Sequence, residues 1–201
     1  MNLFVYVVRH DIGFAPNPFY GYCTLATCKP KIRKAAQLGD WVAGVGSVQK
    51  RQGGKLVYAM QVEEAMCFNE YWNDSRFLQK RPFRPGSIKQ RYGDNIYHRE
   101  TDRAEWIQED GRHSLEDGSP NFSHIRKDTN PPRVLISRNF VYFGNRAVDL
   151  PEQFVSPKNR RLFVGMRDFH RNFPDDVKDA FIEWIEVLCD DGGIRGEPLD
   201  W

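Results

Sequence analysis

The alternation of apolar and polar positions predicts several strands. Residues 3–9 form a run of β-branched and aromatic side chains, a composition typical of a first strand. Residues 51–54 ("RQGG") read as a hairpin turn between two more strands. The expected strands after the first are 39–47, 55–68, 133–144 and a short one around 161–166. The pattern therefore predicts a sheet.

Helical spacing predicts two main helices. Near the C-terminus, Val177, Phe181, Trp184 and Leu188 recur on one helical face, and we expect this stripe to be core packing. Pro174 suits the first turn of that helix. The other main helix is expected over residues 28–38, with Thr27 as its N-cap and Gly39 as its stop, and a short helix is expected over 69–78.

Residues 79–132 differ from the rest of the chain. They hold five prolines, many charges and few aliphatic side chains, and structureless segments of this length are usually functional or disordered. Ile96, Tyr97 and Trp106 favour partial order. The sequence therefore predicts one α+β domain over 1–201, with a strongly bent mixed sheet or a pseudo-barrel, two main helices and a long polar, ligand-facing insertion at 79–132.

Composition narrows the class of protein. The chain is 40% hydrophobic and carries a net charge of +2. This charge is too small for a protein that binds nucleic acid over its whole surface, so any nucleotide or nucleic-acid site must be a local basic patch. No apolar run is long enough for a membrane span, and the first residues lack the basic lead of a signal peptide. The four cysteines form no CxxC pair, as expected of reduced thiols. We expect a cytoplasmic protein without a membrane partner.

Cations gather where the first main helix begins. Lys29, Lys31, Arg33 and Lys34 lie in its expected first two turns, although a helix N-terminus prefers negative charge. The same end of a helix binds phosphate well. Lys29 and Arg33 are four residues apart and can share a face. A phosphate site and a solvated basic face are the two interpretations.

The segment before that helix is rich in polar and aromatic residues. Arg9, His10 and Asp11 end the first strand, where His10 could act as a general base beside Asp11, or all three could form surface ion pairs. Phe14, Phe19 and Tyr20 could stack on a base, and the amide of Asn17 could read its edge. The alternative is that these rings close the core under a loop.

Further candidates are scattered. Tyr97 and His98 in "GDNIYH" could line a pocket mouth, and Cys28 near a helix start could be a nucleophile. His98, His113 and His124 match no standard zinc spacing, so no metal site is predicted. No P-loop, GxSxG, HExxH or GxGxxG motif indicates a cofactor, and the cofactor stays unknown.

Several quoted stretches resemble a known family. The run "YVVRHDIGFAPNPFYGYCTLATCKPKIRKAAQLGDWVAGVGS", with "LVYAMQV" and "GDNIYH", is similar to the second of the numbered nucleotide modification associated domain families. The resemblance implies a bacterial or phage protein linked to modified DNA bases or nucleotides, and it implies no specific reaction. The "GDWV" and "YAMQV" strands also resemble the pseudo-barrels of PUA and EVE-like domains, which hold a modified base.

These observations support three hypotheses. The first is a protein of DNA-modification or phage-defence systems that binds a nucleotide or modified base. Its ligands would be Arg9, Phe14, Asn17, Phe19, Tyr20, Lys29, Arg33, Tyr97 and His98. The second is an enzyme acting on a nucleotide or modified base with His10 and Asp11 in acid–base roles and Cys28 or Tyr97 as an auxiliary. The third is a non-catalytic interaction protein whose partner-binding arm is 79–132.

Overall fold

The computed structural model describes all residues 1–201, and the chain forms two compact units. The first comprises Met1–Asp11, Ala36–Glu63 and Ser137–Trp201. The second comprises Ile12–Ala35 and Glu64–Ile136, so it contains the whole of the expected insertion 79–132. No helix has both the length and the apolar character needed to cross a membrane.

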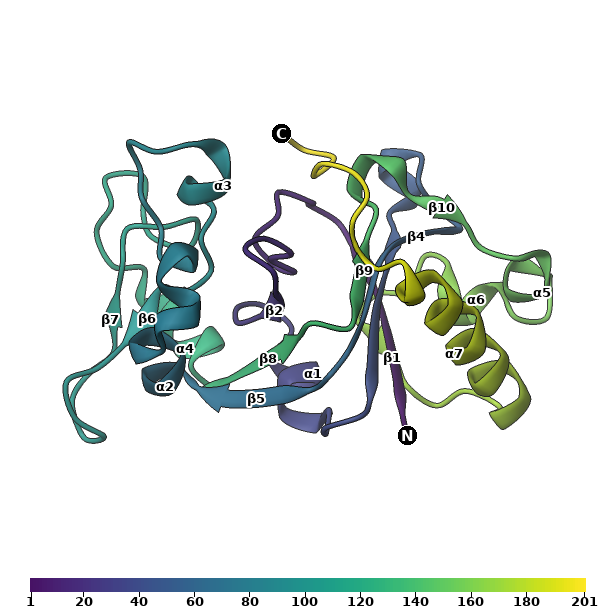
Figure 1. Cartoon of the computed structure of the whole chain (residues 1–201), viewed down its shortest axis with the longest axis horizontal. Coiled ribbons are helices and arrows are strands. Elements are labelled where there is room, and N and C mark those ends of the chain that lie inside the picture. Colours follow the sequence, from purple (N-terminus) through teal and green to yellow (C-terminus); the bar gives the residue numbers. More distant parts are fainter. The chain divides into compact units, whose positions relative to one another are not determined.

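The first unit is built on a seven-stranded mixed sheet (Figure 1). Its order is β11-β1-β3-β4-β9-β12, and β10 also pairs with β4. The pairs β1–β3 and β9–β12 are parallel, whereas β3–β4 and β4–β9 are antiparallel. The strands are β1 (Leu3–Val8), β3 (Trp41–Gly46), β4 (Lys55–Gln61), β9 (Phe140–Tyr142), β10 (Val148–Asp149), β11 (Phe169–His170) and β12 (Gly193–Ile194). The order has two ends, so the sheet is not a closed barrel, and the likeness to PUA and EVE-like pseudo-barrels stays a prediction.

The core of the first unit lies between this sheet and α7 (Asp175–Asp190). Val177 and Phe181 of α7 are buried in one cluster with sheet residues, and Trp184 and Leu188 pack against that cluster. The predicted C-terminal helix and its apolar stripe are confirmed. The other helices of this unit are α5 (Glu152–Val155), α6 (Arg160–Phe163) and the short 3₁₀ helices η1 (Val48–Lys50) and η3 (Gly144–Arg146).

The strand predicted around 161–166 is wrong, because α6 occupies its first half and no strand covers the rest. Phe163 of α6 is buried, and its ring stacks on Phe181 at a centroid distance of 4.7 Å. A short apolar run fits a strand or a buried helical turn equally well, so its periodicity does not separate the two.

The second unit contains two small sheets and four short α-helices. One sheet has the order β2-β8-β5, and the other pairs β6 with β7. Its strands are β2 (Cys23–Leu25), β5 (Glu64–Cys67), β6 (Tyr97–His98), β7 (Ile107–Gln108) and β8 (Arg133–Ser137). Its helices are α1 (Pro30–Ala35), α2 (Phe68–Asn73), α3 (Ile88–Arg91), α4 (Phe122–Asp128) and the 3₁₀ helix η2 (Ser75–Lys80). The single strand predicted over 55–68 is therefore two strands, β4 and β5, in different sheets.

Helix α1 is shorter than predicted. Cys28 and Lys29 have φ values of 56° and 39°, in the left-handed region, so the helix cannot begin before Pro30. Helix α2 begins one residue before the predicted start at 69 and is capped by Cys67, whose sulfur accepts from the Glu70 N–H in a capping box.

A buried polar network orders part of 79–132. The Lys80 ammonium is 0% exposed and donates to the Asn17 side-chain oxygen at 2.7 Å and to the Thr24 hydroxyl at 3.0 Å. The Asp94 carboxylate accepts from Thr24 at 2.6 Å and from Tyr71 at 2.8 Å. Because each buried polar group has a partner, the network holds these residues in place.

Candidate functional site

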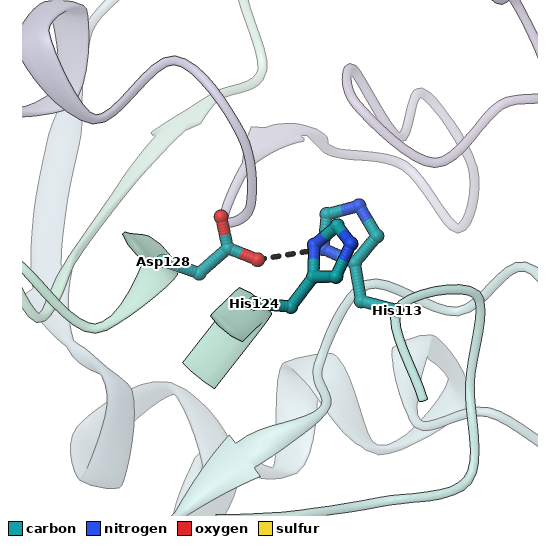
Figure 2. Close-up of side chains that lie close together, drawn as sticks. All are labelled: His113, His124 and Asp128. Carbon is teal, nitrogen blue, oxygen red and sulfur yellow. Dashed lines mark hydrogen bonds and ion pairs between the residues drawn. The ribbon is translucent and has the colours of Figure 1, made fainter. Parts of the chain in front are cut away.

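Cys28, His113 and Asp128 come together in the second unit. The Cys28 Sγ lies 3.6 Å from the His113 Nε2. The Nδ1 of the same ring lies 2.6 Å from the Asp128 Oδ2, the contact dashed in Figure 2. A thiol, an imidazole and a carboxylate in this order are the arrangement of an activated nucleophile, its base and the group that orients the base.

Asp128 is the centre of the arrangement. An ionised carboxylate only accepts hydrogen bonds, so His113 Nδ1 is the donor and Nε2 is the atom that faces the sulfur. The other oxygen, Oδ1, accepts from the backbone N–H of Cys28 at 3.0 Å. The Tyr97 hydroxyl donates to Oδ2 at 3.0 Å. One buried carboxylate therefore fixes both the imidazole and the backbone of the cysteine.

Two short elements position the histidine and the aspartate. Asp128 ends α4, whose N-cap Asn121 accepts from the backbone N–H groups of Ser123 and His124. His113 lies in a tight turn in which the Ser114 hydroxyl donates to the Gly111 carbonyl at 2.7 Å and accepts from the Gly111 N–H at 3.1 Å. Each side chain is thus held by backbone that is fixed through local hydrogen bonds.

Cys28 lies in strained backbone that is clamped from one side. The left-handed φ values at Cys28 and Lys29 are uncommon for residues other than glycine, and such strain clusters at functional sites. Arg33, 0% exposed, donates to the carbonyls of Cys28 at 2.9 Å and of Asp128 at 2.6 Å. It also donates to the carbonyls of Pro131 and Arg133. The Arg33 guanidinium therefore ties the cysteine loop to the end of α4.

The environment shifts the pKa values of the site. Burial alone would lower the pKa of His113, but the hydrogen bond to Asp128 and the interaction with Cys28 raise it to about 9. Burial alone would raise the pKa of Asp128, but His113 and Arg33 lower it below its usual value. At neutral pH, His113 is therefore an imidazolium beside the sulfur, and a neighbouring imidazolium stabilises the nucleophilic thiolate form.

His124 lies next to this group. Its ring is 4.1 Å from the His113 ring between centroids, and its Nδ1 is buried without a hydrogen-bond partner. His124 and Asp128 are four residues apart on α4 and share a face (Figure 2). One ligand atom from each of His113, His124 and Asp128 lies within 4.8 Å of the others, so this set is within reach of a single metal ion.

The two predicted phosphate ligands differ in their exposure: Arg33 is fully buried and Lys29 is partly buried. Arg33 is an interior clamp whose N–H groups bind four carbonyls, so the structure places it inside the unit rather than at an exposed phosphate site. Lys29 is partly buried, and its role as a phosphate ligand stays a prediction. Helix α1, whose N-terminus was the predicted phosphate site, has only six residues.

The predicted base-binding residues are mostly interior. Phe14 and Phe19 are each 3% exposed, so neither presents an open ring face for stacking. Phe14 instead makes an edge-on contact with the His113 ring at 4.8 Å. The Asn17 amide donates to the Tyr92 carbonyl at 3.1 Å and its oxygen accepts from Lys80. Tyr20 is half-buried, and burial raises its pKa.

The residues predicted at the end of the first strand belong to the first unit. Arg9 and His10 are exposed. Asp11 is 4% exposed and accepts from the Tyr142 hydroxyl at 2.5 Å and from the Leu199 N–H at 3.2 Å. Asp11 thus anchors the C-terminal segment of its own unit, and the predicted acid–base roles of His10 and Asp11 stay predictions.

Tyr97 and His98 diverge although they are adjacent. Tyr97 is 0% exposed and donates to Asp128, so it supports the candidate site through that carboxylate. His98 bonds Glu109 at 2.8 Å and stacks on Trp72 at 4.1 Å. Adjacent strand residues point to opposite sides, which explains the divergence.

Sequence reasoning singled out Cys28 and Tyr97 but missed the pairing of His113 with Asp128. One signal was present: His124 and Asp128 are spaced to share a helical face. No local pattern joins residues 28, 113 and 128, so their approach follows from the tertiary structure.

Comparison with known protein families identifies a match over the whole chain. The family model described as nucleotide modification associated domain 2 matches residues 1–201. No curated protein and no solved structure matches the chain.

Proposed function

Because this chain belongs to the nucleotide modification associated domain 2 family, we propose that its second unit is a thiol-dependent enzyme that acts on a nucleotide or a modified base. The observation that carries the proposal is the line from the Cys28 sulfur through the His113 ring to the Asp128 carboxylate, with contacts of 3.6 and 2.6 Å. The family name supplies the nucleotide setting. A place in phage defence stays a prediction.

The arrangement suits hydrolysis of an acyl group carried by a base or sugar. In the proposed scheme, the thiolate form of Cys28 attacks the acyl carbon, so that a C–S bond forms, while the His113 imidazolium holds a proton. As the bond to the amine or alcohol breaks, His113 gives its proton to that leaving group. Water then attacks the thioester with His113 as the base. The products are a carboxylic acid, the freed nucleotide and the regenerated thiol.

Supporting residues have defined tasks in this scheme. Asp128 keeps the His113 ring in the orientation that directs Nε2 at the sulfur. Arg33 and Tyr97 hold Asp128 in place through hydrogen bonds, and Arg33 also holds the loop that contains Cys28. They act through Asp128 and are positioning residues.

Alkylation tests the nucleophile without knowledge of the substrate. We expect iodoacetamide at pH 6.5 to modify Cys28 faster than the exposed Cys67, as read by peptide mass spectrometry, because an imidazolium adjoins only the Cys28 sulfur. His113→Ala should slow labelling of Cys28 at least about tenfold. His98→Ala is the matched control, since His98 also bonds a carboxylate but has no thiol beside it.

Turnover tests the reaction itself. Nucleotides with acylated exocyclic amines are incubated with the protein, and mass spectrometry reads deacylation. Loss of turnover in Cys28→Ala supports the proposal. Full turnover in Cys28→Ala, together with loss in His124→Ala and on chelation, would overturn it in favour of metal chemistry at His113, His124 and Asp128. Tight nucleotide binding with slow, unselective labelling of Cys28 would instead favour binding without catalysis.

A further inference from the structure

The second unit also carries a basic pocket, distinct from the Cys28 site. Its volume is about 300 Å³. The residues that matter in its lining are Arg84, Arg91, Tyr92, Arg112, Ser114 and Glu116. All of them lie within the stretch 79–132 that the sequence singled out as a ligand-facing insertion. A volume of this size is at the lower end of the range for ligand sites, so it suits a small anionic group or a mononucleotide.

The pocket carries uncompensated positive charge. Arg84 is paired with Asp110 at 2.5 Å. Arg91 donates only to the Gly86 carbonyl, at 3.2 Å, and has no ion pair. Arg112 is exposed and has no hydrogen bond or ion pair in the structure. Two arginines without acidic partners therefore line one cavity in which Glu116 is the one acidic lining residue.

Like charges gathered in one pocket repel each other, and folding gains nothing from them. A guanidinium presents several N–H donors in a planar fork that fits two oxygens of a phosphate at once. A bound phosphate would offset the repulsion and satisfy donors that are otherwise left to water. Tyr92 also lines the pocket, although it packs partly against the core of the second unit.

The pocket is connected to the candidate catalytic group through the chain. Arg112 and Ser114 line it, and His113 lies between them in the sequence. The Gly111–Ser114 turn that holds His113 is the same backbone that forms this wall. A phosphate bound here would be anchored to the segment that carries the base.

We propose that this pocket binds the phosphate of the nucleotide on which the Cys28 site acts, with Arg112 and Arg91 as its ligands. The identification of the ligand as a nucleotide rests on the proposed function. Free mononucleotides and single-stranded nucleic acid present the same phosphate chemistry, and binding experiments separate the two sources.

The test measures binding in the Cys28→Ala background, so that turnover does not enter. Calorimetry compares a deoxynucleoside, its 5′-monophosphate and a short single-stranded oligonucleotide. Each titration uses the Cys28→Ala protein with no further change, with Arg112→Ala or with Arg91→Ala. Arg103→Ala is the matched control, because Arg103 is also exposed within the same insertion, lies outside the pocket and has no ion pair.

We expect the monophosphate to bind at least about tenfold more tightly than the nucleoside, as a charge-assisted hydrogen bond permits. Arg112→Ala should remove about tenfold of that affinity, and Arg103→Ala should change it less than twofold. Arg112→Lys, which keeps the charge but not the fork, should fall between them. If only the oligonucleotide responds in this way, the source of the phosphate is a nucleic-acid strand.

Equal affinity for nucleoside and monophosphate, with no response of the oligonucleotide, would overturn the inference. So would an Arg112→Ala variant that matches Arg103→Ala for every ligand while its circular dichroism spectrum is unchanged. Failure of the proposed function looks different: phosphate binding that depends on Arg112 persists, while Cys28 is inert to alkylation and to substrate.

Discussion

At the scale of single residues, Asp128 organises the second unit. Its two carboxylate oxygens accept from the His113 ring, from the Tyr97 hydroxyl and from the Cys28 backbone, and its carbonyl accepts from Arg33. A fully buried charge is costly unless several donors compensate it, and here they do. The same contacts place an imidazole nitrogen at the sulfur. The stability of the second unit and the proposed chemistry therefore both involve the Asp128 side chain.

The His113 contact makes stability depend on pH. The folded-state pKa of His113 is about 9, above the ordinary 6.5. A raised pKa means that the folded state holds the proton more tightly. The stabilisation is therefore complete below about pH 6.5 and is lost as the pH rises through about 9. It amounts to on the order of 3 kcal/mol.

Urea unfolding at pH 6 and at pH 9.5 checks this expectation. The free energy of unfolding should fall between the two pH values by more in the unmodified protein than in His113→Gln. His98→Gln should behave like the unmodified protein. An equal fall in the unmodified protein and in His113→Gln would contradict the assignment of the raised pKa to His113.

At the scale of elements, short segments place the functional groups and one long helix builds the core. Helix α4 supplies His124 and Asp128 to one side of the candidate site. Helix α7 has the contrasting task of covering the sheet of the first unit with an apolar stripe. Its Phe181 lies 4.7 Å from Phe163 and 5.0 Å from Phe154 between ring centroids. That aromatic cluster joins α7 to α5 and α6 within the core of the first unit.

Truncating a side chain of the aromatic cluster should destabilise the protein strongly, whereas truncating a side chain on the exposed face of α7 should not. We expect Phe181→Ala to lower the free energy of unfolding by about 3–5 kcal/mol, because it leaves a cavity among packed rings. Val187, on the same helix but 70% exposed, is the matched control, and Val187→Ala should change stability by less than about 0.5 kcal/mol. Chemical denaturation measures both, and similar values for the two variants would show that the stripe is not the core.

At the scale of the whole molecule, charge is local rather than general. The net charge is only +2, yet three arginines share one pocket of the second unit. A protein that coats nucleic acid contacts many phosphates and loses affinity steeply with salt. A single basic pocket contacts few phosphates, so its affinity depends less on salt. The charge distribution therefore favours recognition of one nucleotide or one position in a strand.

Salt dependence measures this difference. If the two unpaired arginines, Arg91 and Arg112, meet a single strand, the logarithm of the association constant should fall against the logarithm of salt concentration with a slope of about −1.4. Arg112→Ala should make that slope shallower by somewhat less than one. A slope several times steeper, insensitive to Arg112, would show that contacts elsewhere on the chain dominate binding.

The sequence by itself determined the elements whose signal is local. The first strand, the strands around residues 39–61 and the C-terminal helix with its apolar stripe follow from side-chain period and from residues that suit helix ends. Short motifs in the sequence likewise indicate the resemblance to the nucleotide modification associated domain 2 family, and the family match confirms it. Such features need only neighbouring residues, because backbone geometry repeats every two or 3.6 residues.

Only the tertiary structure decided which polar groups meet. Arg33 lies among lysines in the sequence, yet it is buried, because its guanidinium donates to four backbone carbonyls in the interior of the second unit. Cys28 meets His113 and Asp128 across 85 and 100 residues, and no periodic pattern encodes a contact at that separation. Long-range packing of short, irregular segments sets these distances. The sequence could therefore name Cys28 as a candidate nucleophile, but only the fold shows that the His113 ring lies beside its sulfur.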